Sequence, residues 1–346
     1  MKIQTLFIAT NLLVCSAIGQ QSTVQTDRFM GDWQGSFTLN GQAQSAAVYL
    51  IPLGEGSYEA RCVADFDRRG PYLFRLRGAI HGEQFRFIDD IPFDVGRVTG
   101  TTDQGVVLDA SLWSGQLKDG KVQGAVSGRR QGRFELKQTQ RVSPTLGKRP
   151  PADAVVLLDG ASLDAWESQN AGQPVKWKVL PGGIVEVTGG GNIISKEKFG
   201  DHQLHLEFCL PYMPRELGQA RGNSGVYLQS RYEVQVLDSY GLEGADNECG
   251  GIYQIAKPLV NMCAPPLQWQ TYDITFHAAK IDTTGRKVTN ARITVVHNGV
   301  VIRDNLELPK VTGGAVSEQE GQPAGLLLQD HGNPVQFRNV WVERVL

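Results

Sequence analysis

The chain has 346 residues, with 34 Lys plus Arg against 36 Asp plus Glu and a formal net charge of −2. At about 100–200 residues per domain this length predicts two domains. The near-neutral charge gives no global field that would attract nucleic acid or an anionic membrane, so we expect no nucleic-acid partner. Hydrophobic residues at 41% and charged residues at 20% exclude wholesale disorder. The 40 glycines, well above the usual share of about 7%, favour many short strands.

The first 19 residues have the pattern of a signal peptide. Lys2 precedes an apolar run, and Ala17 and Gly19 supply small residues for cleavage after Gly19. The sequence therefore predicts export to the periplasm, the cell envelope or the extracellular space. A short membrane anchor is the alternative, but polar residues interrupt the run, which falls short of the ~20 apolar residues that a span needs. No other stretch has transmembrane length.

Four cysteines remain after this cleavage: Cys62, Cys209, Cys249 and Cys263. An even number in an exported protein permits disulfides. Cys249 and Cys263 flank a short loop, so we expect a disulfide between them, with two buried free thiols as the alternative. No CxxC motif or Cys/His cluster has the spacing of a structural zinc site.

Residues 27–140 predict a β-rich N-terminal domain of unknown role. Tyr58, Ala60 and Cys62 alternate with Glu59 and Arg61, which is typical of a half-buried strand. About eight such segments follow one another, which favours an antiparallel meander, either a small barrel or a curled sheet. Residues 141–151 then predict a solvated linker, because their three prolines oppose regular structure.

Residues 152–346 continue the β pattern with longer spacing. Asn298-Gly299 stands between two β-branched runs and predicts a two-residue hairpin turn, because both central positions of a type I′ turn need positive φ. Roughly a dozen strands in this region predict a two-sheet sandwich. The expected fold class is therefore all-β throughout the chain.

Two segments of this second region predict polar sheet faces. In the first, His205 and Glu207 lie opposite the leucines. In the second, YLQSRYEVQVLD read as one strand gives a shared face of Tyr227, Gln229, Arg231, Glu233 and Gln235. If Ser230-Arg231 is instead a turn, Glu233 and Gln235 stay together and only the placement of Arg231 changes. Such a face suits a sugar, whose hydroxyls need donors and acceptors; a solvated outer face is the alternative.

A predicted turn between two apolar strands carries Gln329, Asp330, His331 and Asn333. A histidine there can titrate near neutral pH, or it can serve only to bond the backbone of the turn. Arg338 lies in the following β-run, where it either reaches a ligand or covers the sheet. Asn223 stands at a strand entrance, which turn chemistry alone would also explain.

The second region resembles the 3-keto-disaccharide hydrolase family. The matching runs occur in family order and include VVLLDGASLDAW, GNSGVYLQSRYEVQVLDSYG, CGGIYQIAKPLVNMCAPPLQWQTYDI, ARITVVHNGVVIRDN and LLLQDHGNPVQFRNVWV. The resemblance covers residues 152–346. Ser230 is a departure, because many relatives have Gly there. The first domain resembles a β-rich region that precedes this domain in some members.

The resemblance implies a concanavalin-like jelly-roll sandwich that acts on a small carbohydrate, a 3-keto-glycoside. A ketone at C3 acidifies the C2 proton, so a base can remove it and the aglycone can leave from C1; addition of water then gives net hydrolysis. Such an enzyme needs a base whose pKa lies near the working pH, a donor to the leaving oxygen, and a positive group or metal for the developing enolate.

Under this resemblance His331 transfers the proton, Glu233 and Glu207 are its acidic partners, and Arg338, or otherwise Arg231, stabilises the enolate. The residues expected to orient the sugar are Asn223, Tyr227, Gln229, Arg231, Gln235, Gln329 and Asn333. A divalent cation on Glu207, Glu233 and His331 could replace the arginine, although no spacing motif indicates a metal.

Three other functions are alternatives to this enzyme. A non-catalytic carbohydrate-binding protein of the same fold is the main alternative, and a scaffold protein is the second. A conventional retaining glycosidase is disfavoured, because Gln235 stands where the related glucanases have a second carboxylate.

Overall fold

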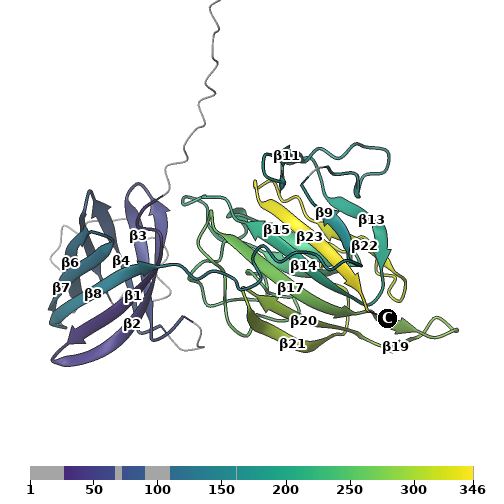
Figure 1. Ribbon diagram of the computed structural model, residues 1–346. Helices are drawn as coiled ribbons and strands as arrows, with labels where there is room; N and C mark the ends of the chain where they lie inside the picture. The colour runs from purple at the N-terminus through teal and green to yellow at the C-terminus, as the bar shows by residue number, and fades with distance from the viewer. Residues whose placement is uncertain (1–26, 67–71, 90–109, 161, 346) are drawn as a thin grey trace, which may run out of the picture.

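The structure is a computed structural model, which describes residues 27–66, 72–89, 110–160 and 162–345. Its regular secondary structure is almost wholly β-strand, in two bodies that lie side by side (Figure 1). Within the described ranges no helix is long and apolar enough to cross a membrane. The predicted signal peptide lies outside the described residues.

The first body is a closed antiparallel barrel whose eight strands, in the described part of the chain, follow one another in order, with β8 pairing back onto β1. The strands are β1 (Gly31–Leu39), β2 (Gln42–Gly54), β3 (Ser57–Val63), β4 (Phe74–His81), β5 (Gln84–Ile88), β6 (Ser111–Lys118), β7 (Lys121–Gly128) and β8 (Gly132–Thr139). Alternate side chains, among them Trp33, Phe37, Trp113 and Phe134, fill the interior. The predicted meander is confirmed as a barrel, which leaves no open sheet edge.

The second body is a sandwich of two antiparallel sheets. The smaller sheet has the order β10-β13-β22-β15-β16, and the larger has the order β11-β12-β23-β14-β17-β20-β21, with β9 beside β23. The strands are β9 (Val155–Leu158), β10 (Trp166–Ser168), β11 (Lys178–Leu180), β12 (Ile184–Glu186), β13 (Ile193–Phe199), β14 (His202–Cys209), β15 (Ser224–Leu228), β16 (Tyr232–Val236), β17 (Trp269–His277), β20 (Ala291–His297), β21 (Val300–Leu308), β22 (Ala324–Leu328) and β23 (Gln336–Arg344). A separate hairpin joins β18 (Lys280–Ile281) to β19 (Lys287–Thr289). The all-β prediction is confirmed.

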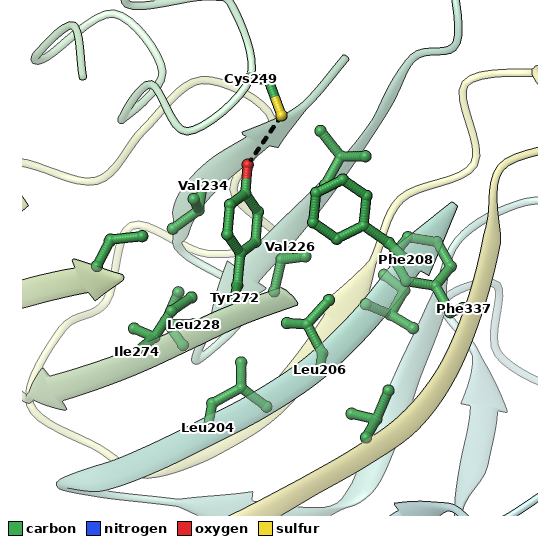
Figure 2. Packing of buried hydrophobic residues seen from close by; sticks show 14 of the residues in the cluster. Leu204, Leu206, Phe208, Val226, Leu228, Val234, Cys249, Tyr272, Ile274 and Phe337 are labelled. Atoms are coloured by element: carbon green, nitrogen blue, oxygen red, sulfur yellow. Dashed lines mark hydrogen bonds between the residues drawn. The ribbon is translucent and has the colours of Figure 1, made fainter. Parts of the chain in front are cut away.

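The core of the sandwich lies between the two sheets. Leu206 and Phe208 of β14 pack in one cluster with Val226 of β15 and Val234 of β16, and all four are fully buried (Figure 2). Burying a side chain of this size contributes about 1.5–3 kcal/mol. Because strand residues alternate between faces, the neighbours of these core residues point away from the core.

Two tight hairpins shape the sandwich. Asn298 and Gly299 have φ of 50° and 83° and join β20 to β21, as predicted. Gln229 and Ser230 have φ of 52° and 54° and join β15 to β16, with the Arg231 N–H donating to the Leu228 carbonyl at 3.0 Å. The single-strand interpretation of YLQSRYEVQVLD is therefore wrong. The turn lies one residue before the alternative Ser230-Arg231 position. Its central residues, Gln229 and Ser230, are not the Gly or Asn that is typical of such turns.

The linker is bound to the larger sheet. Ser143 Oγ lies 2.6 Å from Thr271 Oγ1, Thr145 Oγ1 donates to Asp273 Oδ2 at 2.6 Å, and the N–H of Gly147 donates to Glu207 Oε1 at 2.6 Å. The prolines do leave residues 141–151 without helix or strand. Most of the segment is still exposed, including Lys148 and Arg149, and only a few of its polar groups pair with the sheet.

The predicted disulfide between Cys249 and Cys263 is absent, and both residues are buried free thiols. Cys249 Sγ lies 3.2 Å from the Tyr272 hydroxyl (Figure 2), and Cys263 Sγ donates to the carbonyls of Leu237 and Ala264, each at 3.5 Å. In this apolar core a thiol behaves as a small hydrophobic side chain with a weak donor. The spacing of the cysteines indicated that they lie close together, and it carried no information on their oxidation state.

Candidate functional site

Glu233 and Tyr227 face each other on the side of the smaller sheet that is turned away from the core. They are direct partners in the β15–β16 register, and the Tyr227 hydroxyl donates to Glu233 Oε2 at 2.8 Å. Each residue is 2% exposed. Their neighbours Val226 and Val234 lie in the core, so strand alternation places this pair on the opposite face.

Gly225 leaves the space that the Glu233 carboxylate occupies. A Cβ on Gly225 would lie 2.3 Å from Glu233 Oε1 and 3.1 Å from the Tyr227 ring. Real Cβ atoms do not approach this closely, so a side chain here would displace the carboxylate. The glycine of the GNSGVYL segment therefore serves a close approach in the site.

Burial raises the pKa of Glu233 to about 7, and the hydrogen bond from Tyr227 opposes this only in part. A carboxyl group that titrates near neutral pH suits general acid–base catalysis. Burial and the neighbouring Glu233 also raise the pKa of Tyr227 well above its usual range. The phenol therefore keeps its proton and remains a donor.

Gln329 and Gly313 complete the surroundings of the Tyr227 hydroxyl. Gln329 Nε2 donates to it at 3.2 Å, and the Gly313 carbonyl oxygen also lies 3.2 Å away. Gln329 Oε1 is buried and has no hydrogen-bond partner among the described residues. An unpaired buried acceptor costs about 1–3 kcal/mol, so this oxygen is a place where a ligand hydroxyl would be stabilised.

A second group of amides lies along the same face. Gln235 Nε2 donates to Asn223 Oδ1 at 2.8 Å, and the Asn223 N–H donates to Asn333 Oδ1 at 2.7 Å. Asn223 and Gln235 are buried. Because Gln235 follows Glu233 by two positions on β16, both side chains share one face. The structure thus brings together Glu233, Tyr227, Gln329, Gln235, Asn223 and Asn333 of the predicted residues.

His331 lies at the rim of this group. It is exposed, in the turn after β22 between Gln329 and Asn333, and it has no hydrogen bond or ion pair to any residue that the structure describes. The turn itself is fixed, because Asp330 accepts from the N–H of Gly191 and from that of Gly332, each at 2.9 Å.

Gln229 and Arg231 do not lie on the sheet face that carries Tyr227 and Glu233. Gln229 Nε2 donates to the Phe199 carbonyl at 2.9 Å, and Arg231 Nη1 donates to the Gln322 carbonyl at 3.0 Å. The turn at Gln229–Ser230 ends the alternation of β15 before it reaches these residues. Gln229 therefore holds the end of β13, and Arg231 holds the loop before β22.

The structure does not bring Glu207 and Arg338 to Glu233. Arg338 Nε donates to Glu207 Oε2 at 2.7 Å, and its guanidinium lies 4.0 Å from the Trp269 ring centroid. Glu207 alternates with the core residues Leu206 and Phe208 of the larger sheet, so it points away from the core on the far side of the sandwich. Packed sheets are about 10 Å apart, which is too far for one sugar ring to touch both carboxylates.

Glu207 belongs to the contact between the linker and the larger sheet. Burial alone would raise its pKa, but hydrogen bonds from His205, Asn339, Arg338 and the Gly147 N–H lower it to about 2. It is therefore a permanent carboxylate with its partners in place. A shared metal site of Glu207, Glu233 and His331 is not formed, and the described residues contain no group of three His, Cys, Asp or Glu side chains that could hold a metal ion.

Residues 309–323, here called the cover segment, also reach the site, and no sequence motif predicts this. Thr312 Oγ1 accepts from the Glu233 N–H at 2.9 Å and donates to the Arg231 carbonyl at 3.0 Å. The next residue, Gly313, is the one that reaches Tyr227. The segment has neither helix nor strand, so no periodic pattern could have connected it to the site.

Comparisons with known proteins find one family model and solved structures that are similar to this chain. Residues 153–343 match the family model of the 3-keto-alpha-glucoside-1,2-lyase-like domain. A solved structure from Parabacteroides distasonis, described as a "putative glycosyl hydrolase", is 37% identical with a TM-score of 0.52, over 57% of this chain and 86% of that chain. A second structure with the same description and organism is 17% identical with a TM-score of 0.42, over 56% of this chain and 94% of that chain. A search of the curated proteins finds no match.

The family match and the more similar structure support a carbohydrate-active enzyme. The match spans more than half of the chain and contains both sheets of the sandwich. The chain belongs to the family of the 3-keto-alpha-glucoside-1,2-lyase-like domain.

Proposed function

We propose that the protein is an exported enzyme that cleaves 3-keto-glycosides, with Glu233 as the base that removes the C2 proton. The observation that carries this proposal is the environment of Glu233. Its carboxylate is buried beside Tyr227, and its pKa is about 7. The unpaired Oε1 of Gln329 and the amide groups of Asn223 and Gln235 lie nearby. A base of this kind can take a proton from carbon and return it at neutral pH.

The reaction balances without an oxidant or reductant. Glu233 takes the C2 proton, and the electron pair of the C2–H bond forms an enolate with the C3 carbonyl. The enolate then forms the C1=C2 double bond while the C1–O bond breaks, and the aglycone oxygen leaves with the electron pair of that bond and takes a proton from His331. Water next adds its oxygen to C1 and gives one proton to His331, and Glu233 returns its proton to C2, which gives net hydrolysis.

The neighbouring residues have roles that follow from their places. Tyr227 holds the base in place, and Gln329 beside it offers its unpaired Oε1 to a sugar hydroxyl. Asn223 and Gln235 supply amide groups for the other hydroxyls. His331, exposed at the rim, is the group assigned to exchange protons with the leaving oxygen or with solvent.

The experiment is turnover by the full chain of a 3-keto-glucoside with a chromogenic aglycone, beside its 2,2-difluoro analogue, which has no C2 proton. We expect aglycone release from the first compound and none from the second, and a loss of at least about 100-fold in kcat for Glu233→Gln. Glu135→Gln, on the exposed outside of the barrel, is the matched control and should keep full activity. Saturable sugar binding without turnover would instead identify a carbohydrate-binding protein, and aglycone release from the 2,2-difluoro analogue would contradict the elimination.

Export is a separate part of the proposal, supported by the N-terminal pattern of a charged residue, an apolar run and small residues. Fractionation of the producing cells, followed by N-terminal sequencing, should find a mature chain that begins at Gln20. An intact N-terminus in the cytoplasmic fraction would contradict it.

A further inference from the structure

The Tyr227 hydroxyl has one proton and two acceptors within reach. Glu233 Oε2 lies 2.8 Å away and the Gly313 carbonyl oxygen lies 3.2 Å away. Gln329 Nε2 can only donate, so it occupies a lone pair of the phenol oxygen. Since a phenol donates one hydrogen bond, Glu233 and Gly313 compete for the same proton.

Gly313 lies in the part of the cover segment that touches the site. The segment is attached to the β15–β16 turn by the N–H of Thr312, which donates to the Arg231 carbonyl at 3.0 Å, and by that of Val316, which donates to the Ser230 carbonyl at 2.9 Å. Between these attachments, a Cβ on Gly314 would lie 2.6 Å from the Tyr227 hydroxyl oxygen. Two consecutive glycines give this stretch the backbone freedom to move without moving its attachments.

We propose that Tyr227 couples the protonation state of Glu233 to closure of the cover segment. When Glu233 is a carboxylate, it is the stronger acceptor and holds the phenolic proton, so the Gly313 carbonyl has no donor. When Glu233 is protonated, its acid proton is donated to the Tyr227 oxygen, and the phenol turns its own proton to Gly313. The phenol oxygen then accepts from Glu233 and Gln329 and donates to Gly313, which satisfies all of its hydrogen-bonding capacity.

This inference rests on the proposed function, in which Glu233 carries the C2 proton while the unsaturated intermediate is in the site. The cover segment is latched during that interval and is released when the proton returns to carbon. Closure would thus protect the intermediate from escape at the one stage when it exists, which is the role of lids in other enzymes.

The groups around Glu233 leave Tyr227 as its partner. Tyr227 faces it from β15, Thr312 bonds its backbone from the cover segment, and the Tyr253 N–H donates to its carbonyl at 3.3 Å. Tyr253 also places its ring beside Gly313. Within the described chain no Lys, Arg, His, Asp or other Glu side chain pairs with the Glu233 carboxylate, so its titration acts on Tyr227 directly.

The test is hydrogen–deuterium exchange of the full chain without substrate, from pH 5 to pH 9, with each amide rate corrected for its intrinsic pH dependence. We expect peptides from residues 309–323 to exchange several-fold faster above pH 7 than below it, while the Asn298-Gly299 hairpin stays unchanged. Glu233→Gln, whose amide can donate to Tyr227 as the protonated acid does, should keep the segment slow at every pH. Tyr227→Phe should make it fast at every pH.

Tyr253→Phe is the matched control, because it removes a neighbouring phenol hydroxyl and should preserve the pH dependence. Exchange that is independent of pH in the unchanged protein, or a dependence that survives in Tyr227→Phe, would overturn the coupling. Since no sugar is present, this result separates the two proposals. A pH-dependent segment in a protein without keto-glycosidase activity supports the coupling alone, and activity with a pH-independent segment rejects it alone.

Discussion

The Tyr240 hydroxyl donates to Asp32 Oδ1 at 2.7 Å, from the loop that follows β16 to the first strand of the barrel. Both residues are buried, and Arg141 Nε at the start of the linker donates to Asp32 Oδ2 at 2.7 Å. Asp32 therefore joins the barrel, the linker and the loop after the strand that carries Glu233. The barrel is positioned by a buried charge that has two partners.

Replacing Asp32 should destabilise the whole protein. Asp32→Ala leaves the Arg141 guanidinium and the Tyr240 hydroxyl without their acceptor, and breaking a buried pair of this kind costs about 3 kcal/mol or more. Tyr240→Phe is the control, because it keeps the Asp32–Arg141 pair and should cost only about 1 kcal/mol. Denaturant unfolding measures both. Equal losses for the two variants would contradict the account of Asp32 as the shared acceptor.

The pH profile of turnover should follow Glu233. As a base Glu233 must be ionised, and burial raises its pKa to about 7, so kcat/KM for the 3-keto-glycoside should rise with pH through about 7. Tyr227→Phe removes a hydrogen bond that favours the carboxylate, so it should move the midpoint to higher pH. A profile that is flat from pH 5.5 to pH 8 would exclude Glu233 as the base.

The same burial should lower stability at alkaline pH. The folded pKa of Glu233 is raised from 4.5 to about 7, so the folded state binds the proton more tightly than the unfolded chain. The stabilisation is complete below 4.5 and is lost as the pH rises through about 7. Glu233→Gln cannot ionise, so its free energy of unfolding relative to the unchanged protein should rise from pH 5 to pH 8 by on the order of 2 kcal/mol. Parallel pH dependences of the two proteins would contradict this.

Gly225→Ala should remove activity while the fold persists. The added Cβ would lie 2.3 Å from Glu233 Oε1, so the carboxylate must move away from the substrate, and a misplacement of about 1 Å can cost 100-fold in rate. Gly200→Ala is the control in the same sandwich, because its added Cβ would meet nothing within 4 Å. Initial rates with the keto-glycoside, together with thermal unfolding, distinguish the two variants. Full activity in Gly225→Ala would mean that the carboxylate position is not critical.

Alternation along the chain predicts that the side chains of Glu233 and Glu207 point away from a core. It does not predict which of the two sheets carries each residue. Glu233 is flanked by Tyr232 and Val234, and Glu207 by Leu206 and Phe208, so both strands have the same apolar and polar pattern. A period of two distinguishes only side chains that point toward the core from side chains that point away from it. The strand order, which puts β14 and β16 in different sheets, comes from pairings between distant segments.

Local chemistry explains why some turns and contacts of the structure were predictable from the sequence and others were not. Asn298-Gly299 was predictable, because its residues favour the positive φ that the turn needs, whereas Gln229 and Ser230 adopt the same φ with no such preference. The contact between Gly313 and Tyr227 spans 86 residues of chain and involves a backbone carbonyl. No side-chain pattern could mark it.

The contact between the linker and the larger sheet should weaken as the pH rises. Burial disfavours a charged His205, but its hydrogen bonds to Asp273, at 2.7 Å, and to Glu207 outweigh this and raise its pKa. Its stabilising contribution is therefore complete below the unfolded value of 6.5 and is lost as the pH passes through the higher folded value. His205→Gln should lower the melting temperature more at pH 6 than at pH 9. His277→Gln, at an exposed position on β17, is the control and should show little change at either pH. A deficit of His205→Gln that is the same at both pH values would mean that the charge of His205 contributes nothing to the contact.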